Sequence, residues 1–146
     1  ILAPTLNNYN NIGLVLQEEL KSIGMNAELT TVDWATFMEY RKDPSVFDIY
    51  ITSFASVPLP SLKAYYGPSY PGWTTDEKTA ELLEEFNEAT TRDDALAVWK
   101  ELQEYSWDYL PCISTGHYHV AYACSSKVHG LYMGNGIYLW NAYAEA

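Results

Sequence analysis

Basic residues are scarce in this sequence. The 146 residues include 8 Lys and Arg against 19 Asp and Glu, which gives a formal net charge of −11. Proteins that bind nucleic acid need a basic surface to neutralise phosphates, so the composition argues against DNA or RNA as a partner. Most of the acidic excess lies between Asp76 and Asp108, with 11 acidic and 3 basic residues. We interpret this segment as the solvated face of two helices; a docking surface for a basic partner is the alternative.

Long hydrophobic runs are also lacking. No stretch of about 18 apolar residues occurs, so no segment is predicted to span a membrane. The chain opens with Ile1-Leu2-Ala3-Pro4, which is typical of the inside of a strand, and shows neither an initiator Met nor a signal peptide. We therefore expect residues 1–146 to form a single domain cut from a longer protein. This length suffices for a sizeable core.

Cysteine and the common catalytic motifs are nearly absent. Cys112 and Cys124 are the two cysteines, and their spacing matches no zinc or redox motif. A buried free thiol is the favoured interpretation, and a disulfide stays open. No Gly-x-Ser-x-Gly elbow is present. Gly134-Asn135-Gly136 precedes no predicted helix, which argues against a phosphate-binding loop.

What is present is an alternation of helix and strand patterns from Asn11 to Ser56. A first helix, capped by Asn10 or Asn11, is predicted to end at Gly24, because glycine readily adopts the left-handed conformation that stops a helix. Its buried face is predicted to hold five apolar residues and its exposed face three polar ones: Ile12, Val15, Leu16, Leu20 and Ile23 against Gln17, Glu18 and Lys21.

Three strands are predicted around this helix and the next. They are Ile1–Thr5, Met25–Val32 and Phe47–Thr52, and Asp33 is expected to cap the helix between the last two. Strands joined through a helix should pair in parallel with a right-handed crossover, so Met25–Val32 and Phe47–Thr52 are predicted to pair directly. The predicted fold class is α/β, a three-layer domain with a mostly parallel sheet and helices on both faces.

The second half reads as a loop, two helices and a tail. Val57–Thr74 is rich in proline, glycine and aromatic residues, and its prolines forbid a long helix or central strand. Helices are predicted between Asp76 and Pro111, followed by strands at Cys112–Thr115 and Val120–Ala123 and by an irregular, glycine-punctuated tail.

A binding surface is predicted where the strands end. Ligands of parallel sheets sit beyond the carboxyl ends of the strands, and a long loop in a compact domain is more often functional than idle. The 13 Tyr and 5 Trp suit a site built mainly from aromatic side chains with a few placed polar groups. The predicted ligand-binding residues are Asn7, Tyr9, Ser53, Phe54, Ser56, Tyr66, Trp73, His117 and Tyr118.

Several segments occur in the order found in one known family. They are Leu20–Leu29, Val32–Phe37, Phe47–Ile51, Gly72-Trp73, Leu82-Leu83, Trp99–Gln103, Pro111–Ile113, Gly116, Val128–Gly130 and Trp140-Asn141. In this order the chain resembles the second, C-terminal lobe of the family 5 extracellular solute-binding proteins, the receptors of peptide/nickel-type ABC importers.

That resemblance implies a lobe of a class II periplasmic-binding-protein-like fold, with no enzymatic activity and no cofactor. It implies capture of an oligopeptide, a peptide-like compound or an oligosaccharide, and its delivery to an ABC permease. The implied location is periplasmic or extracellular, with no membrane insertion by this segment; a lipid anchor in the full-length protein stays open.

One segment departs from the family. Peptide-binding members commonly carry an acidic residue in the loop after the Asp48–Ser53 strand, where it pairs with the peptide ammonium. Here that loop, Phe54–Pro60, contains no carboxylate. A neutral ligand, or a peptide-like compound held otherwise, fits at least as well as an ordinary peptide.

Two other classes of function stay open. His117 and His119 share a face in an extended segment and could serve a hydrolase or metal-binding enzyme, although a metal site needs more ligands than these two. The acidic helices could instead form a protein-interaction module.

Overall fold

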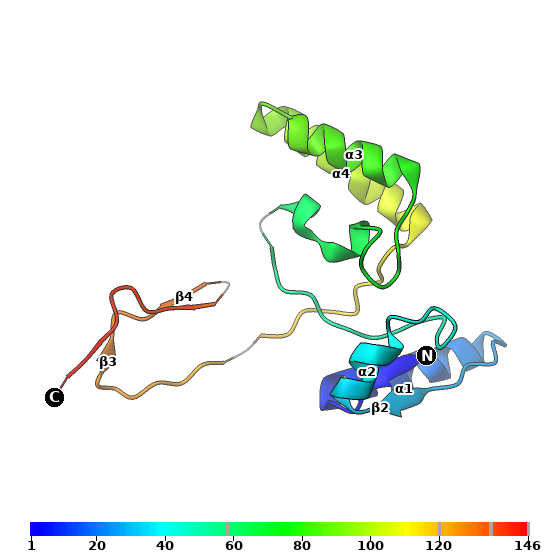
Figure 1. Ribbon diagram of the computed structural model, residues 1–146, viewed down its shortest axis with the longest axis horizontal. Helices are drawn as coiled ribbons and strands as arrows, with labels where there is room; N and C mark the ends of the chain where they lie inside the picture. The colour runs from blue at the N-terminus through cyan, green and yellow to red at the C-terminus, as the bar shows by residue number, and fades with distance from the viewer. Residues whose placement is uncertain (58, 120, 135, 146) are drawn as a thin grey trace.

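The computed structural model describes residues 1–57, 59–119, 121–134 and 136–145. Along the chain it comprises an α/β unit, a helical hairpin and an extended arm (Figure 1). The elements are β1 (Leu2–Pro4), α1 (Asn7–Ser22), β2 (Thr30–Val32), α2 (Trp34–Tyr40), the short 3₁₀ helices η1 (Pro60–Leu62) and η2 (Ala64–Tyr66), α3 (Glu77–Glu88), α4 (Arg92–Tyr109), β3 (Val128–His129), β4 (Tyr132–Met133), β5 (Ile137–Tyr138) and β6 (Tyr143–Ala144).

The α/β unit is built around β1. This strand pairs in parallel with β2, with Leu2 opposite Thr30, and Leu2 also forms a parallel bridge to Tyr50. The Leu2 amide donates to the Ile49 carbonyl at 2.8 Å. The predicted parallel orientation is therefore confirmed. The predicted direct pairing between the second and third strands is wrong, because β1 lies between them.

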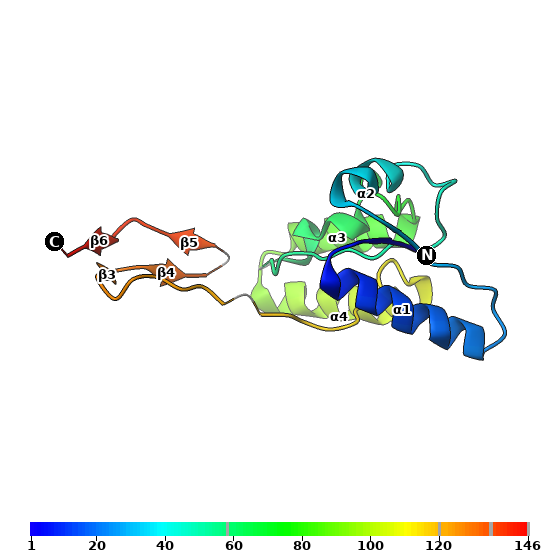
Figure 2. The same ribbon diagram turned by 90° about the horizontal axis from the view of Figure 1, so that it is seen from below.

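This strand order places the two helices on opposite sides of β1, as Figure 2 shows. The chain steps from β1 out to β2 and then returns past β1 to Tyr50, so right-handed crossovers put α1 and α2 on opposite faces. The strands are short, and among the described residues each named sheet has two strands. The extended, mostly parallel sheet of the predicted three-layer domain is not seen in this part of the chain.

The first helix differs from its prediction in start and rotation. It begins at Asn7, ahead of the predicted cap, and Leu6 precedes it without a side-chain capping bond. Gly24 has a φ of +87°, which confirms the predicted left-handed stop. Val15 and Ile23, predicted to be buried, are exposed.

The face that α1 turns to the strands combines the half-buried Ile12, Leu16 and Leu20 of the prediction with Gly13 and Gln17. Gly13 is buried there, and a Cβ at this position would lie 2.8 Å from Leu29 Cδ1. Gln17, predicted to be exposed, donates from Nε2 to the Ala27 carbonyl at 3.1 Å. The helix is rotated because the close approach of Leu29 requires glycine at the contact.

The helical hairpin has a core of its own. Leu82 of α3 and Leu102 of α4 are buried together with Tyr66 of η2, and α3 and α4 run side by side (Figure 1). Asp76 and Thr91 cap the two helices through their side chains. Both predicted helices, and the end of the second before the proline at position 111, are confirmed.

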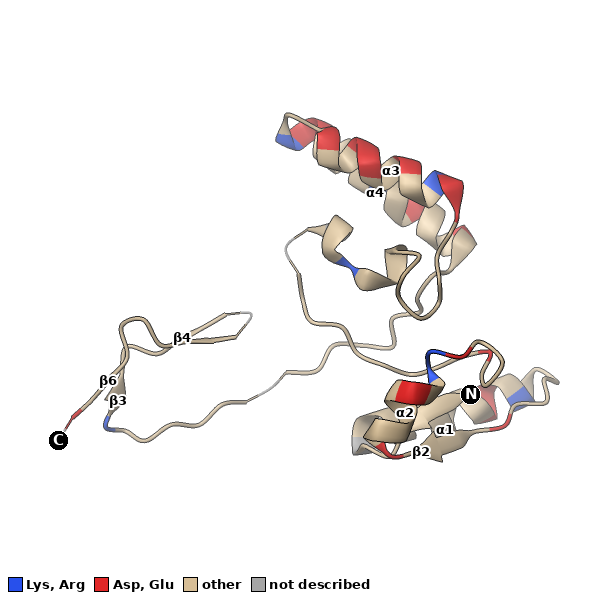
Figure 3. Cartoon of the chain, in the orientation of Figure 1, with Lys and Arg blue, Asp and Glu red and all other residues tan. Residues whose placement is uncertain are grey.

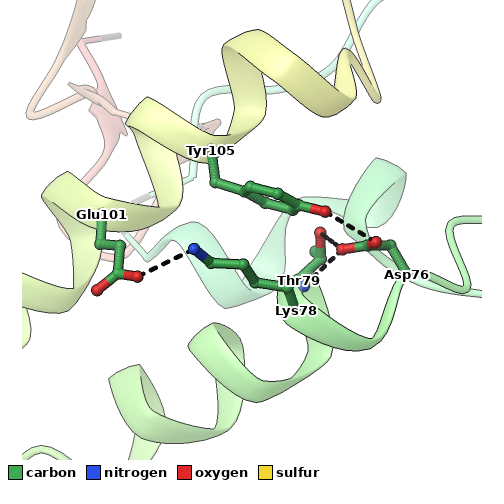
Figure 4. A network of polar contacts seen from close by, with 5 residues as sticks. All are labelled: Asp76, Lys78, Thr79, Glu101 and Tyr105. Atoms are coloured by element: carbon green, nitrogen blue, oxygen red, sulfur yellow. Dashed lines mark hydrogen bonds and ion pairs between the residues drawn. The ribbon is translucent and has the colours of Figure 1, made fainter.

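A polar network ties the start of α3 to α4, as Figure 4 shows. Lys78 Nζ lies 3.2 Å from Glu101 Oε1 and 4.9 Å from the centre of the Tyr105 ring. Tyr105 donates its hydroxyl to Asp76 Oδ1 at 2.9 Å, and the Thr79 amide donates to Asp76 Oδ2 at 2.8 Å. These bonds, the Thr79 amide foremost, lower the pKa of Asp76.

After α4 the chain runs out as an arm (Figure 2). Residues 112–119 are extended, and within them no strand pairing is assigned, so the predicted Cys112–Thr115 strand is not found. Part of the other predicted strand, at residue 120, lies outside the described residues. Cys112 and Cys124 are both free and exposed, so the expected buried thiol is wrong.

The predicted irregular tail is a β-hairpin. β3 pairs with β6 and β4 with β5, both antiparallel, so the second pair is nested inside the first. Gly130 has a φ of +72°, and a Cβ there would lie 2.1 Å from the Asn141 carbonyl oxygen. This close approach requires glycine at the point between the two strand pairs.

Candidate ligand-binding site

The carboxyl ends of the parallel strands bring two predicted site residues together. After β1 the chain enters α1, and after the bridge at Tyr50 it continues to Ser53. There the Tyr9 hydroxyl lies 2.7 Å from Ser53 Oγ. The chain leaves β1 into α1 and reaches Tyr50 from α2, so the strand order reverses at β1, and ligands of open α/β sheets bind at such a switch point.

Trp34 adds an aromatic ring to this edge. Asp33 caps α2 by accepting the Ala35 and Thr36 amides on Oδ1, which fixes the helix directly after β2. The Trp34 ring centre lies 6.3 Å from that of Tyr9 and 5.5 Å from that of buried Phe37. Trp34 remains 44% exposed, so this edge presents a large ring that is supported from behind.

The Asp33 carboxylate is already engaged at this edge. The Thr36 hydroxyl donates to Asp33 Oδ2 at 2.6 Å. Hydrogen bonds from the Thr36 hydroxyl and amide lower the Asp33 pKa. This edge therefore combines hydroxyl and aromatic groups with an ionised carboxylate that the helix cap holds in place.

Phe54 extends the surface toward the long loop. Its ring lies 5.1 Å from Tyr65 and 5.4 Å from Tyr70. Arg41 donates from Nη1 to the Tyr70 hydroxyl at 3.1 Å, with its guanidinium 5.3 Å from the ring centre. Desolvation raises the pKa of Tyr65 to about 12. This cluster fixes the loop against the α/β unit, and Ser56 is exposed beside it.

The other predicted site residues lie elsewhere. Tyr66 is 7% exposed in the helical core, and its hydroxyl lies 3.1 Å from Ser106 Oγ. Trp73 stacks on Phe47 at 6.4 Å. His117 and Tyr118 are exposed on the arm. The nine predicted residues thus do not gather at one edge. Tyr9 and Ser53 meet at this edge, and Phe54 follows Ser53 directly. The helix α1, whose first residue is Asn7, also starts there.

Trp34 is not among the nine predicted site residues. Its position was the available signal, since it follows a cap residue directly after a strand that ends at this edge.

Two surface hollows lie away from the site, one along α3 and α4 beside Lys78 and Glu104, the other along the outer face of α1 beside Val15. They share no residue with the Tyr9 edge.

The described residues contain neither a cluster of metal ligands nor a helix that could span a membrane. Within residues 1–57, 59–119, 121–134 and 136–145, no group of three or more His, Cys, Asp or Glu side chains could hold a metal ion. Across that part of the chain, no helix has the length and apolar character needed to cross a bilayer.

A parallel α/β unit with a hydroxyl-aromatic edge has the character of a surface that binds small molecules. Comparison with known proteins points the same way. The chain is 27% identical over 148 residues to a probable peptide ABC transporter periplasmic-binding protein, y4tO, of Sinorhizobium fredii (strain NBRC 101917 / NGR234). The match covers 90% of this chain and 27% of the relative's length, and no family model matches. This similarity supports a substrate-binding role in general and a periplasmic-binding-protein-like fold.

Proposed function

We propose that this chain is the C-terminal lobe of a family 5 extracellular solute-binding protein, which captures a solute outside the cytoplasm and delivers it to an ABC permease. The observation that carries the proposal is the similarity to a periplasmic binding protein over 90% of the chain. The ordered segments from Leu20 to Asn141 agree with it. The whole of residues 1–146 would then be one lobe of a two-lobed protein in the periplasm or outside the cell.

The rest of the polypeptide would complete both the fold and the site. The three parallel segments around β1 would form the start of a larger, mostly parallel sheet covered by helices on both faces. The edge with Tyr9, Trp34 and Ser53 would form one wall of the cleft. Closure of the two lobes would enclose the solute and remove it from water on both sides.

The chemistry of this wall favours a ligand with hydroxyl or amide groups and a flat apolar face. Tyr9 and Ser53 offer hydroxyls, and Trp34 offers a supported ring. The loop from Phe54 carries no carboxylate, so a peptide ammonium would lack the counter-charge that peptide-binding members commonly offer in this loop. We therefore propose a peptide-like compound or an oligosaccharide ahead of an ordinary peptide with a free amino terminus.

Calorimetry on the full-length protein tests this proposal, with panels of free peptides, amino-blocked peptides and oligosaccharides. Trp34→Ala is expected to weaken binding of the preferred ligand about tenfold or more, equivalent to about 1.4 kcal/mol. Trp107→Ala, a change at a 79% exposed ring on α4, is the control and should leave the dissociation constant unchanged.

Ser53→Ala provides a second variant, since it removes one oxygen without removing the ring that packs on Phe37. It should weaken binding by a smaller factor than Trp34→Ala. A dissociation constant unchanged by both site variants would contradict the assignment of this edge. Failure of every panel member to bind would contradict the receptor function itself.

A further inference from the structure

The outer face of α4 carries a row of exposed apolar side chains. Leu96, Trp107 and Leu110 are 49%, 79% and 50% exposed. Leu96 and Trp107 are eleven residues apart, which is about three helical turns, so they share one face and lie about 16 Å apart along the axis. The opposite face of the helix buries Leu102 in the core of the helical hairpin. α4 therefore has a second apolar face that the described residues leave without a packing partner.

Acidic side chains flank this row. The segment from Asp76 to Asp108 holds 11 acidic and 3 basic residues, and Figure 3 shows the acidic positions along α3 and α4. The hollow along the two helices is lined in part by the carboxylates of Glu104 and Asp108, which lie three residues before Trp107 and directly after it. The exposed row and these two carboxylates together form one surface, which we call the α4 face.

The lysines near the α4 face are already engaged. Lys78 Nζ lies 3.2 Å from Glu101 Oε1, and Lys100 Nζ lies 3.8 Å from Glu104 Oε1. Within the part of the chain that the structure describes, Asp108 forms no ion pair. Exposed ion pairs contribute little to stability, so these carboxylates can take cationic groups of a partner at small cost.

We propose that the α4 face binds a basic amphipathic helix of another protein. Apolar side chains of that helix pack on Leu96 and Trp107. Its Lys or Arg side chains pair with the carboxylates of Glu104 and Asp108. Tryptophan is among the residues that most often dominate the binding energy of an interface, and helices pack on helices along their length, so apolar anchors about three turns apart match the row.

This inference goes beyond the proposed function. The α4 face shares no residue with the edge at Tyr9, Trp34 and Ser53, where the solute is proposed to bind. The two surfaces can therefore be tested separately.

Charge selects this occupant over two others. A second copy of the chain would carry another −11, and like net charge opposes close association. An anionic membrane surface would be repelled for the same reason. A partner with basic side chains gains from the same field, because complementary potentials speed encounter and fix the register of an interface.

Calorimetry on the full-length protein tests the proposal with two synthetic amphipathic helices, one made of leucine and lysine and the other of leucine and glutamate. The leucine–lysine peptide should bind, and its affinity should fall as salt is raised. The leucine–glutamate peptide should not bind. Equal affinity for the two peptides, or no binding of the first, would overturn the proposal.

A pair of tryptophan variants shows whether the peptide sits on the α4 face. Trp107→Ala should weaken binding of the leucine–lysine peptide about tenfold or more. Trp140→Ala removes an 84% exposed ring from the C-terminal β-hairpin and should leave the affinity unchanged. Equal effects of the two changes would overturn the assignment of the face.

A pair of charge variants separates local pairing from net charge. The double change Glu104→Gln with Asp108→Asn and the double change Glu18→Gln with Glu19→Gln on α1 remove the same charge. The first should weaken peptide binding by a larger factor than the second. Equal weakening would mean that binding follows the net charge of the protein, which would overturn the proposal.

Fluorescence of the free full-length protein tests the remaining occupants. The emission lost in Trp107→Phe should be that of a tryptophan in water, accessible to acrylamide. A protected Trp107 would show that the rest of the polypeptide covers the α4 face, and protection that grows with protein concentration would assign the face to a second copy. Either result would overturn the proposal.

Discussion

The helical hairpin of α3 and α4 and the C-terminal β-hairpin of β3 to β6 are stabilised in different ways. α3 and α4 bury Leu82 and Leu102 between them and with η2, and side chains close to each helix start cap their amides. The β-hairpin leaves Trp140 84% exposed. Helical hydrogen bonds and caps are local, so a helix pair can complete its own structure. The strand pairs of the β-hairpin have no buried core of this kind, so their stability depends on what packs against them.

The largest effect is expected in the core of the helical hairpin. Leu102 is fully buried, so Leu102→Ala should cost about 3 kcal/mol in the free energy of unfolding, through lost transfer energy and a cavity. Leu96→Ala, at a 49% exposed position of the same helix, should change it by less than about 0.5 kcal/mol. Urea unfolding followed by circular dichroism measures both, and equal costs would mean that the helices do not depend on this core.

The second prediction concerns the β-hairpin alone. Gly130→Ala forces a Cβ onto the Asn141 carbonyl at positive φ, which should destabilise the hairpin by about 2 kcal/mol. Gly136→Ala, with no atom within 4 Å of the added Cβ, is the matched control. The NMR signals of the β3–β6 pair should be less dispersed in Gly130→Ala and unchanged in Gly136→Ala. Urea unfolding of the helices should be unchanged in both variants. A shift of that helical transition would show that the two regions fold together.

A smaller effect is expected from one hydroxyl of the helical core. Tyr66→Phe removes the contact with Ser106 and should cost about 1 kcal/mol. Tyr109→Phe keeps a ring that stacks on Tyr105 and should cost less. Urea midpoints compare the two variants. A larger loss for Tyr109→Phe would argue that η2 contributes little to this core.

The smallest effect concerns pH. The pKa of Asp76 is lower in the folded chain than its ordinary value of 3.8, so near pH 4 the unfolded chain binds more protons at this residue. Its contribution to stability is fully present above that ordinary value and is lost as pH falls through the lower folded pKa. Asp76→Asn keeps a capping oxygen but removes this charge.

The urea midpoint of the wild-type chain should therefore fall more steeply between about pH 5 and about pH 2 than that of Asp76→Asn. Parallel curves for the two proteins would contradict the assignment of this pH dependence to the α3 cap.

Local signals in the sequence predicted the helices well. The caps Asp33 and Asp76 and the stop at Gly24 are confirmed. Each depends only on residues a few positions away in the sequence. The rotation of α1 was not predictable from spacing alone. Val15 fits a helical stripe by periodicity, but the close approach of Leu29 at Gly13 leaves Val15 exposed at the edge of that stripe.

Strands and the site were predicted less completely, because both depend on contacts between distant residues. The pairing of β1 between its neighbours, and hence the contact of Tyr9 with Ser53, follows from topology that no single segment encodes. Tyr66 was predicted as a ligand contact from its loop, yet a loop aromatic can equally pack on a helix pair, as it does here. Trp34 was not among the predicted site residues, although it follows directly after the cap of a helix at a strand end and is 44% exposed.

The central claim is that this chain carries one wall of a solute site whose other wall lies in the rest of the protein. Titration calorimetry of the 146-residue chain and the full-length protein with the same solute tests this directly. The account predicts binding to the short chain at least 100-fold weaker, a difference of about 2.7 kcal/mol, because half of the contacts are missing. Equal dissociation constants would show that the site is complete within these residues and would contradict the two-walled account.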